Sequence, residues 1–499
     1  RWARASDALI LDPHSQNQGV THTFAHHIYE TLVDRDTEGT LIPRLATEWN
    51  IKEGDNTVWV FKLREGVKFH DGTPFTADDV VFSYGRVTAI PNNPGSYAPY
   101  LSGITGVEKV DDLTVDIVTD VPNPLVPDQT NGILIVSRAA AEGRAPADFD
   151  SGAAAIGTGP FKYGELLKGE SLRLLRNEDY WGEKPAWESV KFTVMTDAGA
   201  RTVALETGEA DLIDLVRPSD ADRLAKIDNI SVARATTNRI LFISASAKPE
   251  SHPLVTDAAG KPLAANPFAD VRVRKAMSLA LNRPGMVDRI FAGYAEATAQ
   301  LATPGTIGYL EDRGADPFSV EEAQKLMAEA GFADGFKTAF WCPNLDVYPQ
   351  LCQAAAQMFA RIGIVGDVQL MPSSSFFSQV NPPANPAPLW ISGWNNLYGN
   401  ALNALIPNVH SYSAELNLGG ANAAGFSNPE ADRLIDAAKQ ELDPAKHAAM
   451  VQDAMRLAVE NYAVIPIARV DTIFATSKNI VYTPGSLNLT LAAWAKPAK

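Results

Sequence analysis

The chain has 499 residues, of which 45% are hydrophobic and 20% are charged, a composition typical of a globular protein with a large buried core. Its 43 basic and 59 acidic residues give a formal net charge of −16, which argues against binding to nucleic acid or to an anionic membrane surface. We expect no membrane span, because no apolar run approaches the roughly 18 residues that one requires. The chain opens at Arg1-Trp2-Ala3-Arg4, so we expect any signal peptide to have been removed.

The first third of the chain predicts short strands separated by turns. Residues 56–63 are rich in β-branched and aromatic side chains, and residues 112–118 alternate polar with apolar side chains, as strands do. Between these segments, Thr76 indicates the start of a helix, because its hydroxyl can bind free backbone N–H groups. Asp78 and Asp79 follow in the first turn, where negative charge suits the helix dipole.

The later half of the chain predicts more helices. Ser319 and Glu322 form the pattern of a capping box, and Asn428-Pro429 and Asp443-Pro444 each place a capping residue before a proline suited to the first helical position. Residues 464–468 are apolar and strand-like. The alternation of strands and helices predicts a mixed α/β protein with more than one lobe.

The sequence lacks the motifs of the common catalytic sites. Residues 26–30 read H-H-I-Y-E, but a metalloprotease helix requires H-E-x-x-H. Residues 157–160 read G-T-G-P, in which the proline is unsuited to a phosphate-binding loop, and no G-x-S-x-G elbow is present. We therefore expect no catalytic residue, no metal and no cofactor, and a hydrolase is the least favoured function.

One long segment carries a family resemblance. Residues 59–80 read W-V-F-K-L-R-E-G-V-K-F-H-D-G-T-P-F-T-A-D-D-V, which resembles the signature of the extracytoplasmic solute-binding proteins of peptide/nickel/opine ABC transporters. Further segments that resemble the family follow in its order and extend over essentially the whole chain: 157–161, Tyr180-Trp181, 206–211 and 270–276. Within the signature we interpret His70 and Asp71 as turn and capping groups.

The resemblance implies a bilobed α/β fold of the periplasmic-binding-protein type, with two crossovers and an extra small domain inserted in the first lobe. We expect residues 1–246 plus 465–499 to form the first lobe, with the inserted subdomain at roughly 45–155. Residues 247–464 would form the second lobe. The ligand cleft would lie between the lobes, which would close around the ligand.

The implied function is the substrate-binding subunit of an ABC importer, a monomeric periplasmic protein that binds a small molecule and delivers it to the permease subunits. It would carry out no reaction. One alternative is an extracytoplasmic chaperone or a chemosensory binding protein with the same fold, which would bind unfolded chains or a receptor.

The strongest candidate for the ligand site is an apolar strand that runs into a loop of aromatic and amide side chains, residues 389–400. Core packing is the alternative for the tryptophans, whereas buried asparagines require hydrogen-bond partners. The ligand-binding candidates from this region and from the strand at 338–341 are Trp341, Trp390, Trp394, Asn395, Asn396, Leu397, Tyr398 and Asn400.

Two positions depart from the dipeptide-binding members of the family. Those relatives have an aspartate for the ligand amino group where this chain has Leu397, and an arginine for the ligand carboxylate where it has Asp346. Losing a charge-assisted hydrogen bond costs roughly 1.5–3 kcal/mol. We therefore favour a sugar or a sugar–amino-acid conjugate of the opine kind over a simple peptide, since aromatic faces and amides suit hydroxyl-rich or cationic ligands. A peptide held by its backbone is the alternative.

The opposite wall is expected to include residues 17–22, with His22 as a ligand candidate, and the turn at 95–100. A surface histidine is the alternative for His22, and we see no convergent set of histidines for a nickel chelate. The two cysteines, Cys342 and Cys352, are expected to pair if the protein is exported, closing a loop of about ten residues. Two free buried thiols are the alternative.

Overall fold

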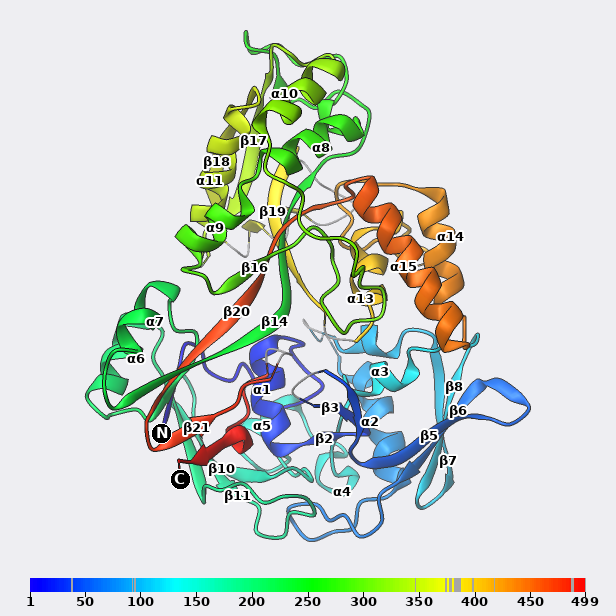
Figure 1. Ribbon diagram of the computed structural model, residues 1–499. Coiled ribbons are helices and arrows are strands. Elements are labelled where there is room, and N and C mark those ends of the chain that lie inside the picture. Colours follow the sequence, from blue (N-terminus) through cyan, green and yellow to red (C-terminus); the bar gives the residue numbers. More distant parts are fainter. Residues whose placement is uncertain are drawn as a thin grey trace. The chain divides into compact units, whose positions relative to one another are not determined.

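The computed structural model describes residues 1–499 except 37–38, 92, 94–95, 346, 373–374, 377–378, 381–386, 397–398, 417, 486–488 and 499. The chain divides into two compact units, Arg1–Thr237 with Thr472–Lys499, and Asn238–Asp471. It passes from the first unit to the second inside β14 (Ile230–Ala245) and returns inside β20 (Ile465–Ser477), as can be followed in Figure 1. The chain therefore passes between the units twice, the number of crossovers that the resemblance implies.

The main sheet of the first unit has the strand order β10-β11-β12-β1-β13, followed by the end of β20. The short β1 pairs in parallel with β12 on one side and β13 on the other, and its Trp2 and Ala3 are buried. The strands are β1 (Trp2–Arg4), β10 (Phe161–Leu167), β11 (Ser171–Arg176), β12 (Ser189–Val194) and β13 (Leu212–Ile213).

A separate antiparallel sheet of the first unit has the order β5-β6-β8-β7, and α2 packs against it. The strand expected at 56–63 is β6, and the one expected at 112–118 is β8. The Asp79 carboxylate accepts a hydrogen bond from the Thr76 N–H (3.0 Å), so the predicted helix start is confirmed. The elements are β5 (Ala46–Lys52), β6 (Asp55–Leu63), β7 (Ile104–Asp111), β8 (Thr114–Thr119) and α2 (Ala77–Ala89). The inserted subdomain expected at roughly 45–155 remains a prediction.

Smaller elements complete the first unit. Three two-stranded pairs join β2 (Glu30–Thr31) to β9 (Leu134–Ile135), β3 (Val33–Arg35) to β4 (Leu41–Pro43), and β21 (Ile480–Tyr482) to β22 (Ala495–Pro497). The helices are α1 (Gly19–Ile28), α3 (Val126–Thr130), α4 (Arg138–Ala141), α5 (Pro146–Asp150), α6 (Ala198–Glu206) and α7 (Pro218–Leu224), with 3-10 turns at Ala98–Leu101 and Ala492–Trp494. The apolar core packs α1 and the C-terminal segment against the main sheet, through residues such as Phe24, Phe192 and Phe474.

The second unit is built on the strand order β14-β19-β17-β15, with β18 beside β17 and β16 beside β20. β17 runs parallel to both β18 and β19, whereas β14 and β19 are antiparallel. The strands are β15 (Val255–Thr256), β16 (Ala295–Ala297), β17 (Phe336–Pro343), β18 (Ile364–Met371) and β19 (Leu389–Asn395).

The helices of the second unit begin where the capping residues predict. The Ser319 hydroxyl accepts from the Glu322 N–H, and the Asn428 and Asp443 side chains each accept two backbone N–H groups. The helices are α8 (Val271–Ala280), α9 (Arg283–Ile290), α10 (Val320–Glu329), α11 (Tyr348–Ala360), α13 (Leu402–Asn408), α14 (Pro429–Ala438) and α15 (Pro444–Glu460), with a 3-10 turn at Pro267–Ala269.

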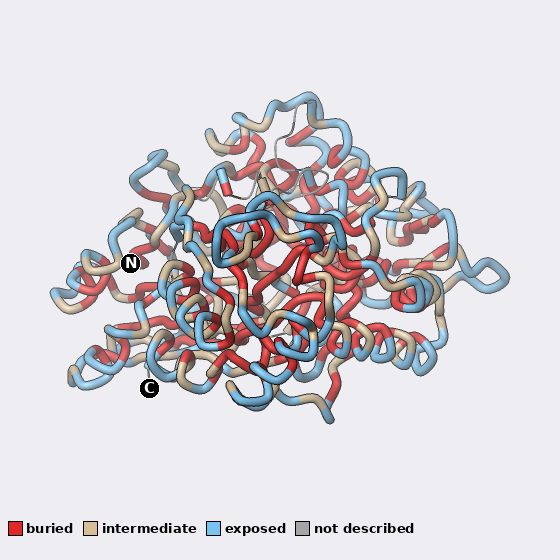
Figure 2. Tube along the Cα trace, turned by 90° about the horizontal axis from the view of Figure 1, so that it is seen from above, coloured by how far each residue is buried: buried red, intermediate tan, exposed pale blue. Residues whose placement is uncertain are grey.

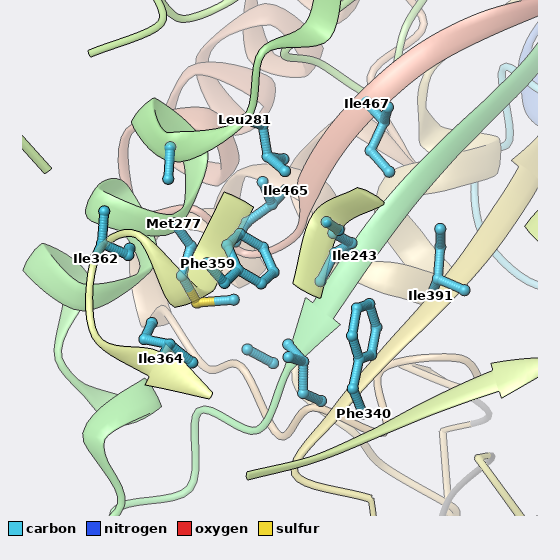
Figure 3. Packing of buried hydrophobic residues seen from close by; sticks show 14 of the residues in the cluster. Ile243, Met277, Leu281, Phe340, Phe359, Ile362, Ile364, Ile391, Ile465 and Ile467 are labelled. Atoms are coloured by element: carbon cyan, nitrogen blue, oxygen red, sulfur yellow. The ribbon is translucent and has the colours of Figure 1, made fainter. Parts of the chain in front are cut away.

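The largest apolar core of the second unit lies between its sheet and the helices α8–α11. Figure 3 shows Phe340 of β17 and Phe359 of α11 in this core, with ring centroids 6.4 Å apart. Cys342 and Cys352 are also buried here and form a disulfide that links β17 to α11, the pairing expected of an exported protein. Figure 2 shows where buried and exposed residues lie along the Cα trace.

The family-like motifs of the first unit meet at one buried carboxylate. Glu30, 3% exposed, accepts hydrogen bonds from Thr158 Oγ1 (2.8 Å), Tyr180 Oη (2.7 Å) and Trp181 Nε1 (2.8 Å). Arg44 Nε lies 2.8 Å from its Oε1 and neutralises the charge. Because a buried carboxylate is costly unless paired and hydrogen-bonded, these segments depend on one another.

His70 of the signature attaches a turn to the same loop. Its Nε2 donates to the Gly159 carbonyl (3.0 Å), and its Nδ1 accepts from the Gly157 N–H (3.4 Å). The Asp71 carboxylate accepts from the N–H and hydroxyl of Thr73 within its own turn. The interpretation of His70 and Asp71 as turn and capping groups is therefore confirmed.

Gly157 is required by a close backbone approach. A Cβ atom at this position would lie 2.0 Å from the Ile28 carbonyl oxygen at the end of α1, a contact that backbone atoms cannot relieve without moving. The Gly159 N–H donates to the same carbonyl at 2.9 Å. The loop therefore packs directly on α1 because it has no side chain at residue 157.

We predict that Gly157→Ala lowers the free energy of unfolding by about 1–3 kcal/mol, because overpacking forces backbone shifts. The matched control is Gly85→Ala, at an exposed position inside α2 where a Cβ meets nothing within 4 Å. That control should be neutral or stabilising by up to about 1 kcal/mol. Urea denaturation measures both variants. Equal stabilities of the two variants would contradict the assigned packing.

Candidate solute-binding site

The strand β19 has two faces with different environments. Leu389 and Ile391 point into the large apolar core, and the alternation of side chains places Trp390 and Trp394 on the other face. Trp390 is 3% exposed and lies directly opposite Trp341 of β17, which is 8% exposed. Both indoles belong to what we call the tryptophan cluster, whose buried residues are Ala339, Trp341, Phe376, Val380, Ala387, Trp390, Ala423 and Ala424.

Trp394 is only half-buried, so part of its ring is open to a ligand. Its Nε1 donates to Asn403 Oδ1 of α13 at 3.2 Å, and this bond fixes the orientation of the ring. The next residue, Asn395, is exposed and ends the strand. Of the predicted tryptophans, Trp394 therefore has the environment that best suits a ligand platform.

The buried asparagines of the predicted site have structural bonds. Asn400 Oδ1 accepts from the Leu402 N–H at the start of α13, and its Nδ2 lies 2.5 Å from His447 Nε2. Asn396 Nδ2 donates to the Leu301 carbonyl at 2.7 Å. The argument that these amides need partners holds, but the partners shown are protein groups, so their role as ligand contacts remains a prediction.

Two buried polar atoms near this region lack a partner among the residues that the structure describes. They are the indole Nε1 of Trp341 and the side-chain oxygen Oδ1 of Asn396. A buried donor or acceptor without a hydrogen bond costs about 1–3 kcal/mol. Each atom is therefore suited to bind a water molecule or a polar ligand atom.

Three predicted site residues lie outside the described residues: Asp346, Leu397 and Tyr398. The absence of the dipeptide charge partners, which depends on residues 346 and 397, therefore stays a prediction from the sequence.

Sequence reasoning missed two residues beside the exposed end of β19. Arg239 of β14 is paired in register with Asn395, and its guanidinium donates to the Tyr348 hydroxyl at 3.0 Å. A Cβ atom on Gly393 would lie 2.9 Å from the same hydroxyl, so glycine permits this packing. No local sequence signal links β14, α11 and β19, because their proximity depends on strand register.

In the first unit, the two segments expected to form a wall do meet. The His22 ring lies 5.1 Å from the Tyr97 ring and 6.1 Å from the Tyr100 ring, measured between centroids. His22 Nε2 is 2.8 Å from Asn17 Oδ1, and Asn17 Nδ2 donates to the Ser96 carbonyl. The sequence therefore identified two segments that pack on each other. We call the rings of His22, Tyr97 and Tyr100 the aromatic wall; both tyrosines are buried, and contact of this cluster with a ligand stays a proposal.

Several histidines of the first unit are held neutral by burial. Burial lowers the pKa of His22 and of His27 to about 3, and the pKa of His14 and of His70 to about 4. His27 is 2.8 Å from the Thr23 carbonyl through Nδ1, and its Nε2 accepts from the Ala492 N–H at 2.9 Å. These bonds require a neutral ring and attach the C-terminal segment to α1.

Comparison with known proteins decides the family. The model for the middle part of the bacterial extracellular solute-binding proteins, family 5, matches residues 40–415. The chain belongs to this family. As a family 5 protein, it is the substrate-binding component of an ABC importer. No helix among its described residues is long and apolar enough to cross a membrane.

Curated relatives match this family 5 protein over nearly its whole length. The glutathione-binding protein GsiB of Shigella boydii serotype 4 (strain Sb227) is 28% identical over 488 residues, covering 96% of this chain and 90% of the relative. The glutathione-binding protein GsiB of Escherichia coli (strain K12) is 27% identical over the same length and shares.

Solved structures confirm the bilobed α/β fold expected from the sequence. HbpA2 from Haemophilus parasuis has a TM-score of 0.83 and 25% identity, covering all of this chain and 99% of that one. The ABC transporter substrate-binding protein CtaP from Listeria monocytogenes has a TM-score of 0.84 and 20% identity, with coverage of 100% and 99%. The second likeness concerns the fold alone.

The buried histidines predict how stability depends on pH. The pKa of His27 falls from 6.5 to about 3 on folding, so between these values the unfolded chain binds a proton that the native protein does not. The contribution of His27 to stability is therefore fully present above about pH 6.5 and decreases as the pH is lowered. Each such histidine contributes a slope of about 1.4 kcal/mol per pH unit within the window.

We predict that His27→Gln makes the unfolding free energy depend less steeply on pH between pH 7 and pH 5, because unfolding of the variant takes up about one proton fewer. Glutamine can replace both hydrogen bonds of His27 without titrating. Urea denaturation at several pH values measures the slope for the wild type and the variant. Identical slopes would show that His27 does not stay neutral in the native protein.

Proposed function

We propose that this protein captures a small amino-acid-containing solute, a short peptide or an amino-acid conjugate, in the periplasm and delivers it to ABC permease subunits. We also propose that the protein works as a monomer and catalyses no reaction. The observation that carries it is the half-exposed Trp394 ring, held by Asn403 and flanked by the exposed amide of Asn395. An aromatic face beside a few oriented polar groups is the usual composition of a small-molecule site.

The relatives support the amino-acid part of this proposal. The curated proteins that match over nearly the whole chain are glutathione-binding proteins, and glutathione is a peptide-like solute. A sugar–amino-acid conjugate shares the amino-acid group, and the tryptophan platform suits its sugar ring. The preference for a conjugate over a peptide rests on Leu397 and Asp346. We therefore retain the conjugate as the second candidate within the same class.

We further propose that solute binding is coupled to closure of the two units, the motion typical of two-domain binding proteins. The chain crosses between the units in β14 and β20, and residues at such crossings can absorb a hinge rotation. β19, which bears Trp394, pairs with β14. A bound solute is therefore expected to change the relation of the units as well as the site.

Native mass spectrometry of the purified protein, followed by identification of any molecule released on denaturation, should reveal a bound amino-acid-containing solute. Isothermal titration with glutathione, with an opine and with a disaccharide then distinguishes the candidates. We expect glutathione or the opine to bind saturably without being consumed. Binding of the disaccharide alone, or turnover of any of them, would overturn the proposal.

We predict that Trp394→Ala weakens binding of the identified solute by more than about 1 kcal/mol, because the ring contributes contact area. Trp59→Ala is the matched control, since Trp59 is also half-buried and also donates one indole hydrogen bond, to the Asn123 carbonyl. Calorimetry measures the dissociation constants and thermal melting measures stability. If both variants lose stability alike while affinity is unchanged, Trp394 is a packing residue.

A further inference from the structure

The first unit contains a cavity of about 270 Å³ between α1, the β3–β4 hairpin and the C-terminal segment. Its volume is close to the lower end of the range for small-molecule sites, which suits one functional group with its alkyl stem. Glu30 and His27 in its wall are almost fully buried. The lining includes His26, Glu30, Asp34, Ile42, Arg44 and Trp494.

The acidic side chains of the lining carry more negative charge than its arginines neutralise. Arg44 Nε lies 2.8 Å from Glu30 Oε1 and 3.7 Å from Asp34 Oδ2, so one guanidinium is divided between two carboxylates and is closer to Glu30. Arg35, the other arginine of the lining, pairs with Asp128, an acid outside the cavity. Asp34 accepts from the Arg35 N–H (2.8 Å) and from Asn131 Nδ2 (3.2 Å), neutral donors that add no positive charge, so Glu30 and Asp34 share the one guanidinium of Arg44. The field in the cavity therefore favours a cation.

The other walls suit an organic cation. Trp494 and Tyr29 contribute aromatic surface, which attracts ammonium and guanidinium groups. Burial lowers the pKa of His26, so its ring adds no positive charge. Among the described ranges of the chain, no three His, Cys, Asp or Glu side chains converge as metal ligands would. A carboxylate beside aromatic rings is instead a common environment for ammonium or guanidinium.

His26 connects this cavity with the aromatic wall. Its ring stacks on that of His22, one helical turn earlier on α1, with centroids 6.2 Å apart. One side of His26 therefore lines the cavity, and the other touches the wall of His22, Tyr97 and Tyr100. The cavity and the aromatic wall therefore lie one helical turn apart along α1.

We propose that the cavity is a cation subsite, in which Asp34 binds an ammonium or guanidinium group and Trp494 packs against its stem. This inference rests on the proposed function for the claim that the group belongs to the transported solute. The inference implies that the transported solute carries at least one positively charged group. The recognition of the cation itself depends on the geometry of the first unit.

The test uses a small probe, so that it does not depend on knowing the solute. n-Butylguanidinium chloride and n-butylurea have nearly the same shape, but only the first is charged. Titration of the whole protein, followed by NMR of the Trp494 indole N–H, should give a saturable shift with n-butylguanidinium and none with n-butylurea. Equal shifts with the two probes, or no shift with either, would overturn the proposal.

Two variants separate charge from shape. Asp34→Asn should weaken n-butylguanidinium binding about tenfold, as expected for the loss of a charge-assisted hydrogen bond. Ile42→Trp should block the cavity without changing its charge. Asp112→Asn is the matched control, because Asp112 is an exposed acid of the same unit paired with Lys109, and it should bind the probe like the wild type. Unchanged binding by Asp34→Asn or Ile42→Trp would place the probe elsewhere.

The solute identified by native mass spectrometry completes the test. If the inference is right, its dissociation constant rises about tenfold in Asp34→Asn and is unchanged in Asp112→Asn. If the protein binds no amino-acid-containing solute, the proposed function fails while the probe result still decides whether the cavity is a cation subsite. A bound solute whose affinity is the same in all three proteins would remove the cavity from the transport site.

Discussion

The buried carboxylate of Glu30 is the interaction on which much of the first unit depends. It gathers the Thr158 loop, the Tyr180-Trp181 pair and Arg44, segments that are far apart in the sequence. A charge that is nearly excluded from water must be neutralised and fully hydrogen-bonded. Loss of any one partner would therefore leave the Glu30 carboxylate incompletely paired and destabilise the contacts of the other partners. The G-T-G-P and Tyr-Trp motifs are therefore explained by a shared acceptor rather than by contact with a solute.

The same ion pair shapes the chemistry of the neighbouring cavity. Arg44 pairs with Glu30 at 2.8 Å and with Asp34 at 3.7 Å, so its single positive charge is divided between two carboxylates. The structural demand of one acid thus leaves a second acid with negative character at the cavity wall. In the second unit, one face of β19 points into the apolar core, while Trp394 on the other face remains half-exposed.

Local chemistry made much of the fold predictable. The side chains of Ser319, Asn428 and Asp443 cap helices as expected, since a cap depends on residues within one turn. Thr76 stands at the start of α2 as expected, but there the Asp79 carboxylate accepts from Thr76, and the Thr76 hydroxyl accepts no backbone N–H among the described residues. The apolar strand at the start of the tryptophan–asparagine stretch is β19, and the two segments grouped by the sequence meet at His22, while their role in binding stays a prediction. By contrast, the partners of Asn400 and the nearness of Arg239 to Tyr348 depend on register and on contacts between distant elements. Hydrophobic patterns and turn signals carry no information about such contacts.

The bond between Cys342 and Cys352 has a consequence for how this protein can vary. It closes residues 342–352 into a ring whose ends are fixed to β17 and α11, beside the strand that bears Trp341. The bond holds its two ends together whatever exposed side chains lie between them, whereas Tyr348 and Leu351, also between the cysteines, belong to the core. Changes at exposed positions of the ring therefore leave β17 and α11 covalently joined.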